Sequence, residues 1–236
     1  MKGSERTLQT LRFRGSPIGL DALVGVPQED FSGLPTFAIE NINLDTTHRV
    51  FVAHATQGAT RLRITVAPNT APGIYKGLAQ VGDQMYPVEI KIEPYIHLSA
   101  SPRQLVIQAS AGQKLYEDLV LANTGNVPCT IGPTYAFGLY DVDGVENGIG
   151  KMFRQTQSSD RSRVDYLVDQ LAEGHPGAVK LRIEEGAGTI APGEVRALRL
   201  NFHMPTGLKP GHTYTGTLPL HNLRYYIEVR PTEIVT

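Results

Sequence analysis

The chain has 236 residues, 41% of them hydrophobic and 19% charged, which is typical of a globular protein long enough for two small domains. Its 22 basic residues are balanced by 23 acidic ones, so no long-range field would attract nucleic acid or an anionic membrane. The single cysteine, Cys129, excludes an intramolecular disulfide and any zinc site that needs two cysteines.

The N-terminal residues, Met1 to Thr7, contain no apolar segment of the kind that a signal peptide needs. No apolar run approaches the length of a membrane span, so we expect no membrane insertion. The compartment stays open. The chain is cytoplasmic as written, or exported or part of the cell envelope if a leader has been removed.

The N-terminal part of the chain predicts strands. A strand is expected over residues 7–14. The apolar run over residues 16–27 is interrupted by Pro and Gly, and it fits either a pair of strands or a loop packed across a sheet. The next strand is expected to include Thr36–Ile39.

The strongest pattern is a motif that occurs twice. In the first copy, residues 62–66 alternate between apolar and polar, as in a strand with one buried face. Pro72-Gly73 then predicts a tight turn, because Pro presets φ and Gly accepts the positive φ that follows. Tyr75 opens the next strand, and a final alternating strand ends at Pro94.

The second copy repeats this order. An alternating strand over residues 198–202 precedes Pro210-Gly211, Tyr214 opens the next strand, and the last strand ends at Pro231. One residue separates Pro-Gly from Tyr in the first copy and two do in the second. A tyrosine after such a corner can bury its ring and place its hydroxyl on loop backbone, as in a tyrosine corner.

This pattern resembles bacterial and archaeal immunoglobulin-like modules over most of residues 50–136 and 190–231. The Asn-Thr-Gly-Asn-Val-Pro run at residues 123–128 is similar to an opening found in immunoglobulin-like domains beside carbohydrate-active enzymes. The resemblance implies an all-β fold of two tandem immunoglobulin-like sandwiches. It leaves function open, because such modules occur as spacers, adhesin stalks, sugar-binding appendages and chaperones.

The repeat sets the expected domain bounds. The first sandwich is expected over residues 1–96, and the second over residues 97–236. The chain after Pro94 leads into a new first strand at Gln104–Gln108.

The second sandwich is expected to carry an insertion over about residues 138–188. Within it, Ser158-Ser159-Asp160 resembles a helix N-cap, and Gly174 sits where a helix would end. One short amphipathic helix is therefore predicted, with its apolar positions at Val164, Leu167, Val168 and Leu171. The helix either covers an open end or edge of the sandwich or docks a partner.

The best metal candidate is Asp141, Asp143 and Asn147, since carboxylates at alternate positions around a glycine suit a calcium loop. The spacing fails the EF-hand pattern, and a β-turn with Asp-Gly at its tip explains the same residues. We therefore expect no metal site and no cofactor.

No catalytic motif is found. The histidines are scattered, with no His-x-His, His-x3-His or His-Glu-x-x-His spacing, and there is no Gly-x-Ser-x-Gly elbow. Cys129 has apolar neighbours, which favours a small buried side chain over a nucleophile. The run Gly186-Ala187-Gly188 is interpreted as a tight turn and not as a phosphate cradle, because a strand follows it. The protein is therefore expected not to be an enzyme.

For sugar binding, flat aromatic side chains are the usual platform, and the chain has no Trp. The nearest clusters are Tyr225-Tyr226 and Tyr135/Phe137/Tyr140, of which alternation assigns at least half to the core. The function expected is a non-catalytic structural or protein-interaction module that binds a protein partner or assembles with itself. The alternatives are a periplasmic pilus-type chaperone and a carbohydrate-binding appendage.

Overall fold

The computed structural model describes residues 10–24, 36–39, 51–54, 60–81, 84–144, 146, 149–150, 153 and 163–233. β-strands dominate these residues, which confirms the predicted all-β fold. The chain separates into two compact units, one of residues 1–97 with 124–128 and the other of residues 98–123 with 129–236.

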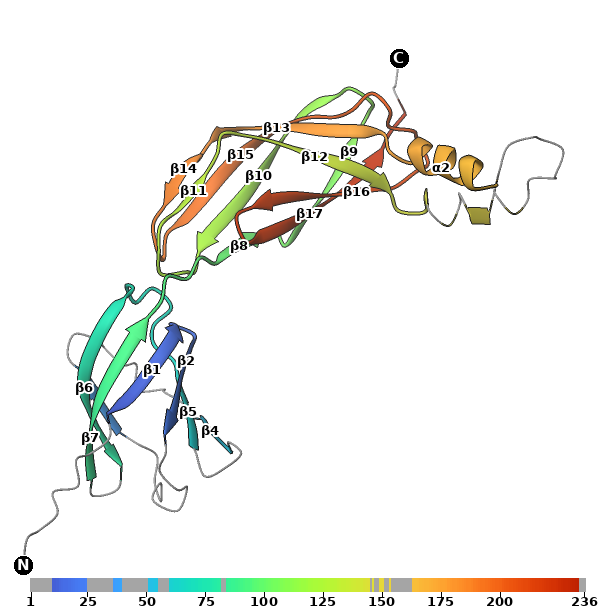
Figure 1. The fold of residues 1–236 in the computed structure, drawn as a ribbon. Coiled ribbons are helices and arrows are strands. Elements are labelled where there is room, and N and C mark those ends of the chain that lie inside the picture. The colour runs from blue at the N-terminus through green and yellow to red at the C-terminus, as the bar shows by residue number, and fades with distance from the viewer. Residues whose placement is uncertain are drawn as a thin grey trace, which may run out of the picture. The chain divides into compact units, whose positions relative to one another are not determined.

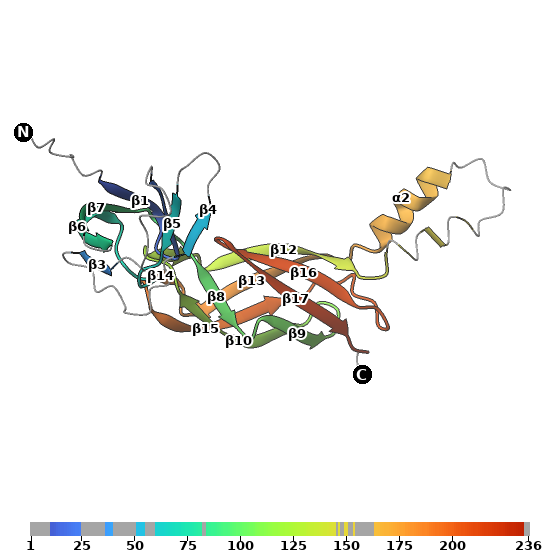
Figure 2. The ribbon, with the colours of Figure 1, turned by 90° about the horizontal axis from the view of Figure 1, so that it is seen from below.

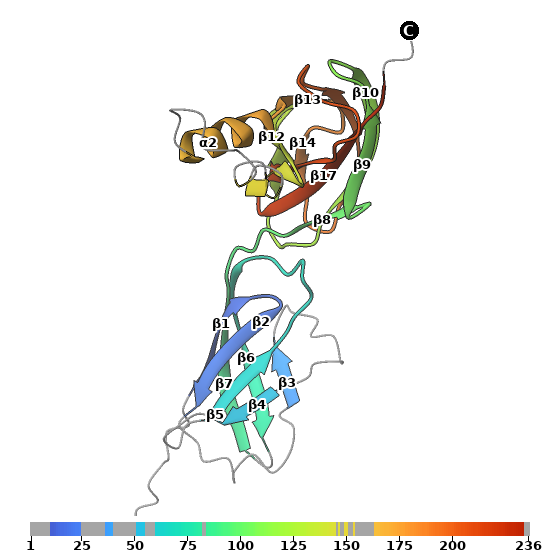
Figure 3. The same cartoon turned by 90° about the vertical axis from the view of Figure 1, so that its right-hand side faces the viewer.

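The described part of the first unit contains seven strands (Figure 3). One layer joins β2, β5 and β4, and the other joins β3, β6 and β7. The first strand, β1, pairs antiparallel with β2 and parallel with β7, so it connects the two layers. The strands are β1 (Leu11–Ser16), β2 (Gly19–Val24), β3 (Thr36–Ile39), β4 (Phe51–His54), β5 (Thr60–Ile64), β6 (Gly73–Val81) and β7 (Gln84–Ile92).

In chain order, β1 to β7 take the places of strands A to G of an immunoglobulin-like sandwich, with A, B, E and D in one layer and C, F and G in the other. Alternation explains the burial, because Leu11 and Phe13 face the core while Arg12 faces solvent. The apolar run after the first strand contains one described strand, β2, hairpin-paired with β1, and its last residues, 25–27, lie outside the described residues. The strand expected at Thr36–Ile39 is confirmed as β3.

The described part of the second unit contains one eight-stranded sheet, whose strand pairs form one continuous ladder, and a two-stranded sheet, here called the ribbon (Figure 1). The ladder runs β8-β10-β15-β13-β12-β16-β17-β9, and the ribbon pairs β11 with β14. The strands are β8 (Leu98–Ser101), β9 (Gln104–Ala109), β10 (Lys114–Asn123), β11 (Cys129–Ile131), β12 (Thr134–Asp141), β13 (Gly177–Glu185), β14 (Gly188–Ile190), β15 (Val195–His203), β16 (Tyr214–Leu220) and β17 (Leu223–Pro231).

The same topology recurs in this ladder. The first strand is split into β8, which pairs antiparallel with β10, and β9, which pairs parallel with β17. The order β8-β10-β15-β13 corresponds to A-B-E-D, and β12-β16-β17 corresponds to C-F-G. Both units are therefore immunoglobulin-like sandwiches, and β11 and β14 are additions to the second.

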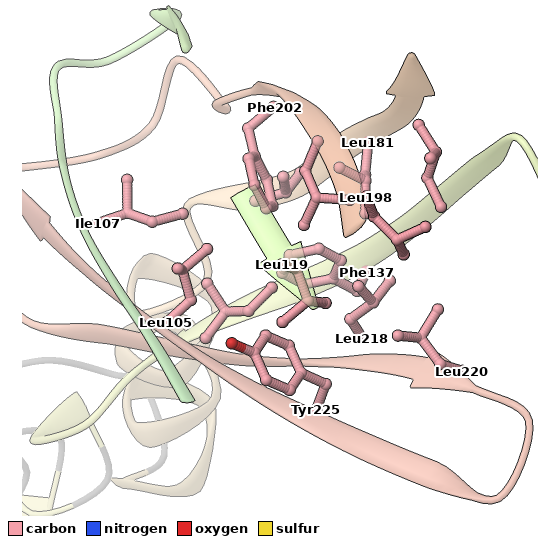
Figure 4. Packing of buried hydrophobic residues seen from close by; sticks show 14 of the residues in the cluster. Leu105, Ile107, Leu119, Phe137, Leu181, Leu198, Phe202, Leu218, Leu220 and Tyr225 are labelled. Atoms are coloured by element: carbon pink, nitrogen blue, oxygen red, sulfur yellow. The ribbon is translucent and has the colours of Figure 1, made fainter. Parts of the chain in front are cut away.

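The core of the second sandwich lies between its two layers (Figure 4). Leu119 and Leu198 come from one layer, and Phe137, Leu218 and Tyr225 from the other. All five are at most 7% exposed. Their alternation with exposed neighbours is what directs them to one face of each strand.

The two repeated tyrosines lie near the start of equivalent strands, β6 and β16. Tyr75 packs against the first core, and its hydroxyl donates a hydrogen bond to the Ala71 carbonyl at 2.8 Å. Tyr214 is buried in the second core, with its hydroxyl close to the backbone of Lys209. Both tyrosines occupy the position of a tyrosine corner.

The glycines of the two Pro-Gly corners differ in backbone conformation. Gly211 has a positive φ of 81°, as the Pro-Gly turn predicts. Gly73 is already the first residue of β6 and has no positive φ. The prediction of a positive φ is therefore wrong for the first copy, where the strand begins at the glycine itself and not three residues after it, as in the second copy.

The insertion lies between β12 and β13, that is, between strands C and D. It is shorter than the predicted residues 138–188, because β12 continues to Asp141 and β13 begins at Gly177. The predicted amphipathic helix is present as α2 (Arg163–Glu173), which is 11 residues long. The Ser158-Ser159-Asp160 segment proposed as its N-cap lies outside the described residues.

Candidate functional site

The metal candidates are only partly within the described residues. The two carboxylate oxygens of Asp141 each have a partner: Oδ1 accepts from the backbone N–H of Asp143 at 3.1 Å, and Oδ2 lies 2.7 Å from Nδ1 of His212. Asn147 lies outside the described residues, so this three-residue set stays a prediction. In the described part of the chain, no three His, Cys, Asp or Glu residues gather as metal ligands.

Asp141 instead joins three parts of the second sandwich. Its backbone N–H donates to the carbonyl of Gly174, directly after α2, and its side chain is paired with His212 in the corner before β16. His212 also stacks on Tyr214, with ring centroids 5.9 Å apart. This cluster therefore anchors the C-terminal end of the helix to the tyrosine corner.

Cys129 lies in the core of the second sandwich, and Gly186 lies in a turn. Cys129 lies in β11 within the second core, and burial raises the pKa of its thiol, which disfavours the nucleophilic thiolate. Gly186 has a positive φ of 87° and forms the turn between β13 and β14, as interpreted from the sequence.

The described surface of the second sandwich carries a groove of about 410 Å³ over β12, β16 and β17. Its floor is made of small residues, among them Gly138 and Gly216, with Thr215 and Thr217 beside them. Tyr140 on β12 and Tyr226 on β17 line the groove and are 63% and 60% exposed. They are the outward-facing members of the two aromatic clusters found in the sequence, whereas Phe137 and Tyr225 are buried in the core.

Neighbouring residues fix the ring of Tyr140. It stacks on His175, with centroids 5.0 Å apart and an interplanar angle of 24°. His175 is held in turn by a short hydrogen bond between its Nδ1 and the carbonyl of Leu139. A Cβ at Gly138 would lie 3.1 Å from His175 and 3.4 Å from the Tyr140 hydroxyl, so the glycine leaves room for this stack.

The apolar face of α2, here called the α2 stripe, consists of Val164, Leu167, Val168 and Leu171. Val164 is 66% exposed and Val168 is 58% exposed, and Leu171 is also exposed. Of the two roles considered for this helix, the exposure of these side chains disfavours covering the sandwich. Figure 2 gives the reason, since α2 extends away beyond the end of β12, where Asp141 anchors its C-terminal end.

No helix in the described part of the chain combines the length and the apolarity needed to cross a bilayer. An exposed stripe of this size on an 11-residue helix is more typical of a surface that meets another molecule.

No family model matches the sequence, and no curated protein matches it either. Among solved structures, a titin fragment is 10% identical with a TM-score of 0.26, covering 97% of each chain. A protein of unknown function from Porphyromonas gingivalis is 11% identical with a TM-score of 0.26, covering 95% of this chain and 97% of that one. An endo-fucoidan hydrolase of glycoside hydrolase family 107 is 9% identical with a TM-score of 0.24, covering 95% of this chain and 28% of that one. Function must therefore be argued from this chain's own residues.

Proposed function

We propose that this chain is a non-catalytic interaction module that binds a protein through the α2 stripe. The exposure of Val164, Val168 and Leu171 carries the proposal, because apolar side chains at this spacing are the anchors that a helix uses in an apolar groove of a partner. The partner is a protein with such a groove, either a second copy of this chain or another protein of the assembly.

The flanking charges support a protein occupant. Asp165 and Asp169 lie on the same helix, to one side of the α2 stripe. An amphipathic helix of this kind favours a groove with an apolar floor. Acidic residues beside the stripe also disfavour an anionic lipid surface.

The test compares a stripe variant with a matched control. Val164→Gln with Val168→Gln removes two anchors, and Gln is a good helix former. Val195→Gln is the control, because Val195 is 65% exposed on β15 of the same unit. Sedimentation velocity of the wild type first shows whether the chain associates with itself. Photo-crosslinking from position 171 in the native source then identifies any other partner.

The proposal predicts that the stripe variant loses self-association or the crosslinked partner, and that Val195→Gln keeps it. A wild type that neither associates nor crosslinks would overturn the proposal. So would a stripe variant that behaves like the control.

The pilus-type chaperone has less support. Such chaperones act by strand donation, which requires a strand with a free edge. The last strand of each sandwich is paired on both sides, β7 with β6 and β1, and β17 with β16 and β9.

A carbohydrate-binding appendage, as found beside carbohydrate-active enzymes, is the second candidate. The specific observation in its favour is the groove lined by Tyr140 and Tyr226.

A further inference from the structure

We infer that the groove over β12, β16 and β17 is a binding site for a short, uncharged oligosaccharide. The inference goes beyond the protein-interaction function, because it concerns a different surface of the second sandwich. It rests on the placement of Tyr140 and Tyr226 about a floor of small residues.

The strand register sets the spacing of the two rings. Tyr140 is opposite Thr215, and Tyr226 is opposite Thr217, on the shared neighbour β16. The two tyrosines thus stand two strand spacings apart, about 10 Å, and are offset by two residues along the strands. Rings at this separation can contact two units of one oligosaccharide chain that are not adjacent to each other.

The rings offer the flat apolar surface on which the C–H face of a pyranose packs. The ring of Tyr140 is held in advance by its stack on His175, so little rotamer freedom would be lost on binding. Thr215 and Thr217 line the groove from β16, the strand between those that carry the rings, and their hydroxyls can donate to or accept from sugar hydroxyls. An apolar platform with a few polar groups is the usual composition of a small-ligand site.

Charge complementarity favours a neutral ligand. None of the residues that line the groove carries a charge at neutral pH. On the neighbouring stretch of β17, Glu228 and Arg230 form an ion pair, with 2.7 Å between Nε of Arg230 and Oε1 of Glu228.

A peptide strand is a poorer occupant of this groove. A peptide that adds to a sheet needs a free strand edge for its main-chain hydrogen bonds. All three strands beneath the groove have neighbours on both sides: β12 has β13 and β16, β16 has β12 and β17, and β17 has β16 and β9. The floor therefore offers side chains and ring faces to a ligand, and no backbone ladder.

Titration calorimetry and an immobilised array of neutral gluco-, manno- and xylo-oligosaccharides test the inference. Oligo-uronates and a proline-rich peptide form the comparison arms. The variants are Tyr140→Ala and Tyr226→Ala, with circular dichroism as a check on folding. The matched control is Tyr116→Ala, because Tyr116 is 54% exposed on β10, in the other layer.

The wild type is expected to bind at least one neutral oligosaccharide. Each groove variant should weaken binding about tenfold or more, which corresponds to about 1.4 kcal/mol, and Tyr116→Ala should leave it unchanged. The inference is overturned if no neutral oligosaccharide binds, if only a uronate or the peptide binds, or if the folded groove variants bind as the wild type does.

Discussion

Tyr214 and Tyr225 share one core, yet the hydroxyl of Tyr214 lies close to the backbone of Lys209, whereas that of Tyr225 is buried with no hydrogen-bond partner in the described part of the chain. Both side chains are 1% exposed, and their strands, β16 and β17, are neighbours. The same substitution at these two positions should therefore have opposite effects, because removal of a hydroxyl that interacts with the backbone costs stability and removal of an unpaired buried one restores it.

Tyr214→Phe should destabilise the second sandwich. The variant loses the polar interaction of the hydroxyl with the Lys209 backbone, which should be worth up to about 1 kcal/mol, and keeps the buried ring. Differential scanning calorimetry, in which the unfolding of the two units can be separated, measures the effect. An unchanged unfolding temperature would show that the hydroxyl has no part in holding the corner.

Tyr225→Phe should stabilise the same sandwich by about 1 kcal/mol or more, because it removes a buried hydroxyl that has no partner in the described structure. Urea denaturation at neutral pH gives the free energy of unfolding. A loss of stability would mean that the hydroxyl has a partner such as a buried water.

The pKa of Tyr225 provides a second measurement. Burial raises it to about 12, with the charge of Glu117 adding to the effect. The folded pKa lies above the unfolded value of about 10. The stability linked to the protonated Tyr225 hydroxyl is therefore fully present below pH 10 and is lost as pH rises towards 12. Alkaline unfolding of the wild type should therefore be steeper in this interval than that of Tyr225→Phe.

Asp21→Asn should lower the stability of the first sandwich at neutral pH, with an effect that fades in acid. Hydrogen bonds from Arg63 and Arg61 hold the pKa of Asp21 well below its usual range. A lowered folded pKa gives stability that is present above the unfolded pKa of about 3.9 and is lost as pH falls further. Urea denaturation of both proteins between pH 2 and about pH 7 checks this. A difference that stays constant with pH would contradict the electrostatic cause.

Gly186→Ala should strongly destabilise the second sandwich. Gly186 has a φ of 87°, and an added Cβ would lie 2.2 Å from the carbonyl oxygen of Ala197. Strain and this clash together should cost more than about 2 kcal/mol. Gly211→Ala is the control, because its φ is also positive at 81° but nothing lies within 4 Å of the added Cβ. Equal losses for the two variants would show that the close approach at Gly186 is not decisive.

The repeat could be predicted from the sequence because its signals are local. Pro-Gly followed by Tyr75 or Tyr214 specifies a corner through backbone preferences and the placement of the tyrosine hydroxyl near the preceding loop backbone. Alternation then specifies which face of each neighbouring strand is buried.

The groove could not be predicted, because it depends on long-range register. Tyr140 and Tyr226 are far apart in sequence, and only the pairing of β12 and β17 with β16 brings them to one surface. Alternation correctly indicated that part of each aromatic cluster is buried, but not that the exposed members would meet.

The position of α2 could not be predicted from the sequence either. The spacing of Val164, Val168 and Leu171 defines an apolar stripe, but amphipathicity does not say what covers it.

The grouping of the short loop over residues 124–128 could not be predicted either. The Asn126 side chain bonds to the backbone of Glu93 and Tyr95, so this loop groups with the first unit although it follows strand β10 of the second.

The central claim is that each unit is an immunoglobulin-like sandwich in which the first strand lies parallel to the last. Disulfide trapping tests it directly. The pair Arg12→Cys with Glu89→Cys joins β1 to β7, and the pair Val106→Cys with Glu228→Cys joins β9 to β17, each at residues that are opposite in the parallel ladder. Cys129 should not compete, because it is buried and the pKa of its thiol is raised. The account predicts rapid crosslinking of both pairs under mild oxidation and slow crosslinking of the out-of-register pair Arg12→Cys with Lys91→Cys. Failure of both in-register pairs in the folded protein would contradict it.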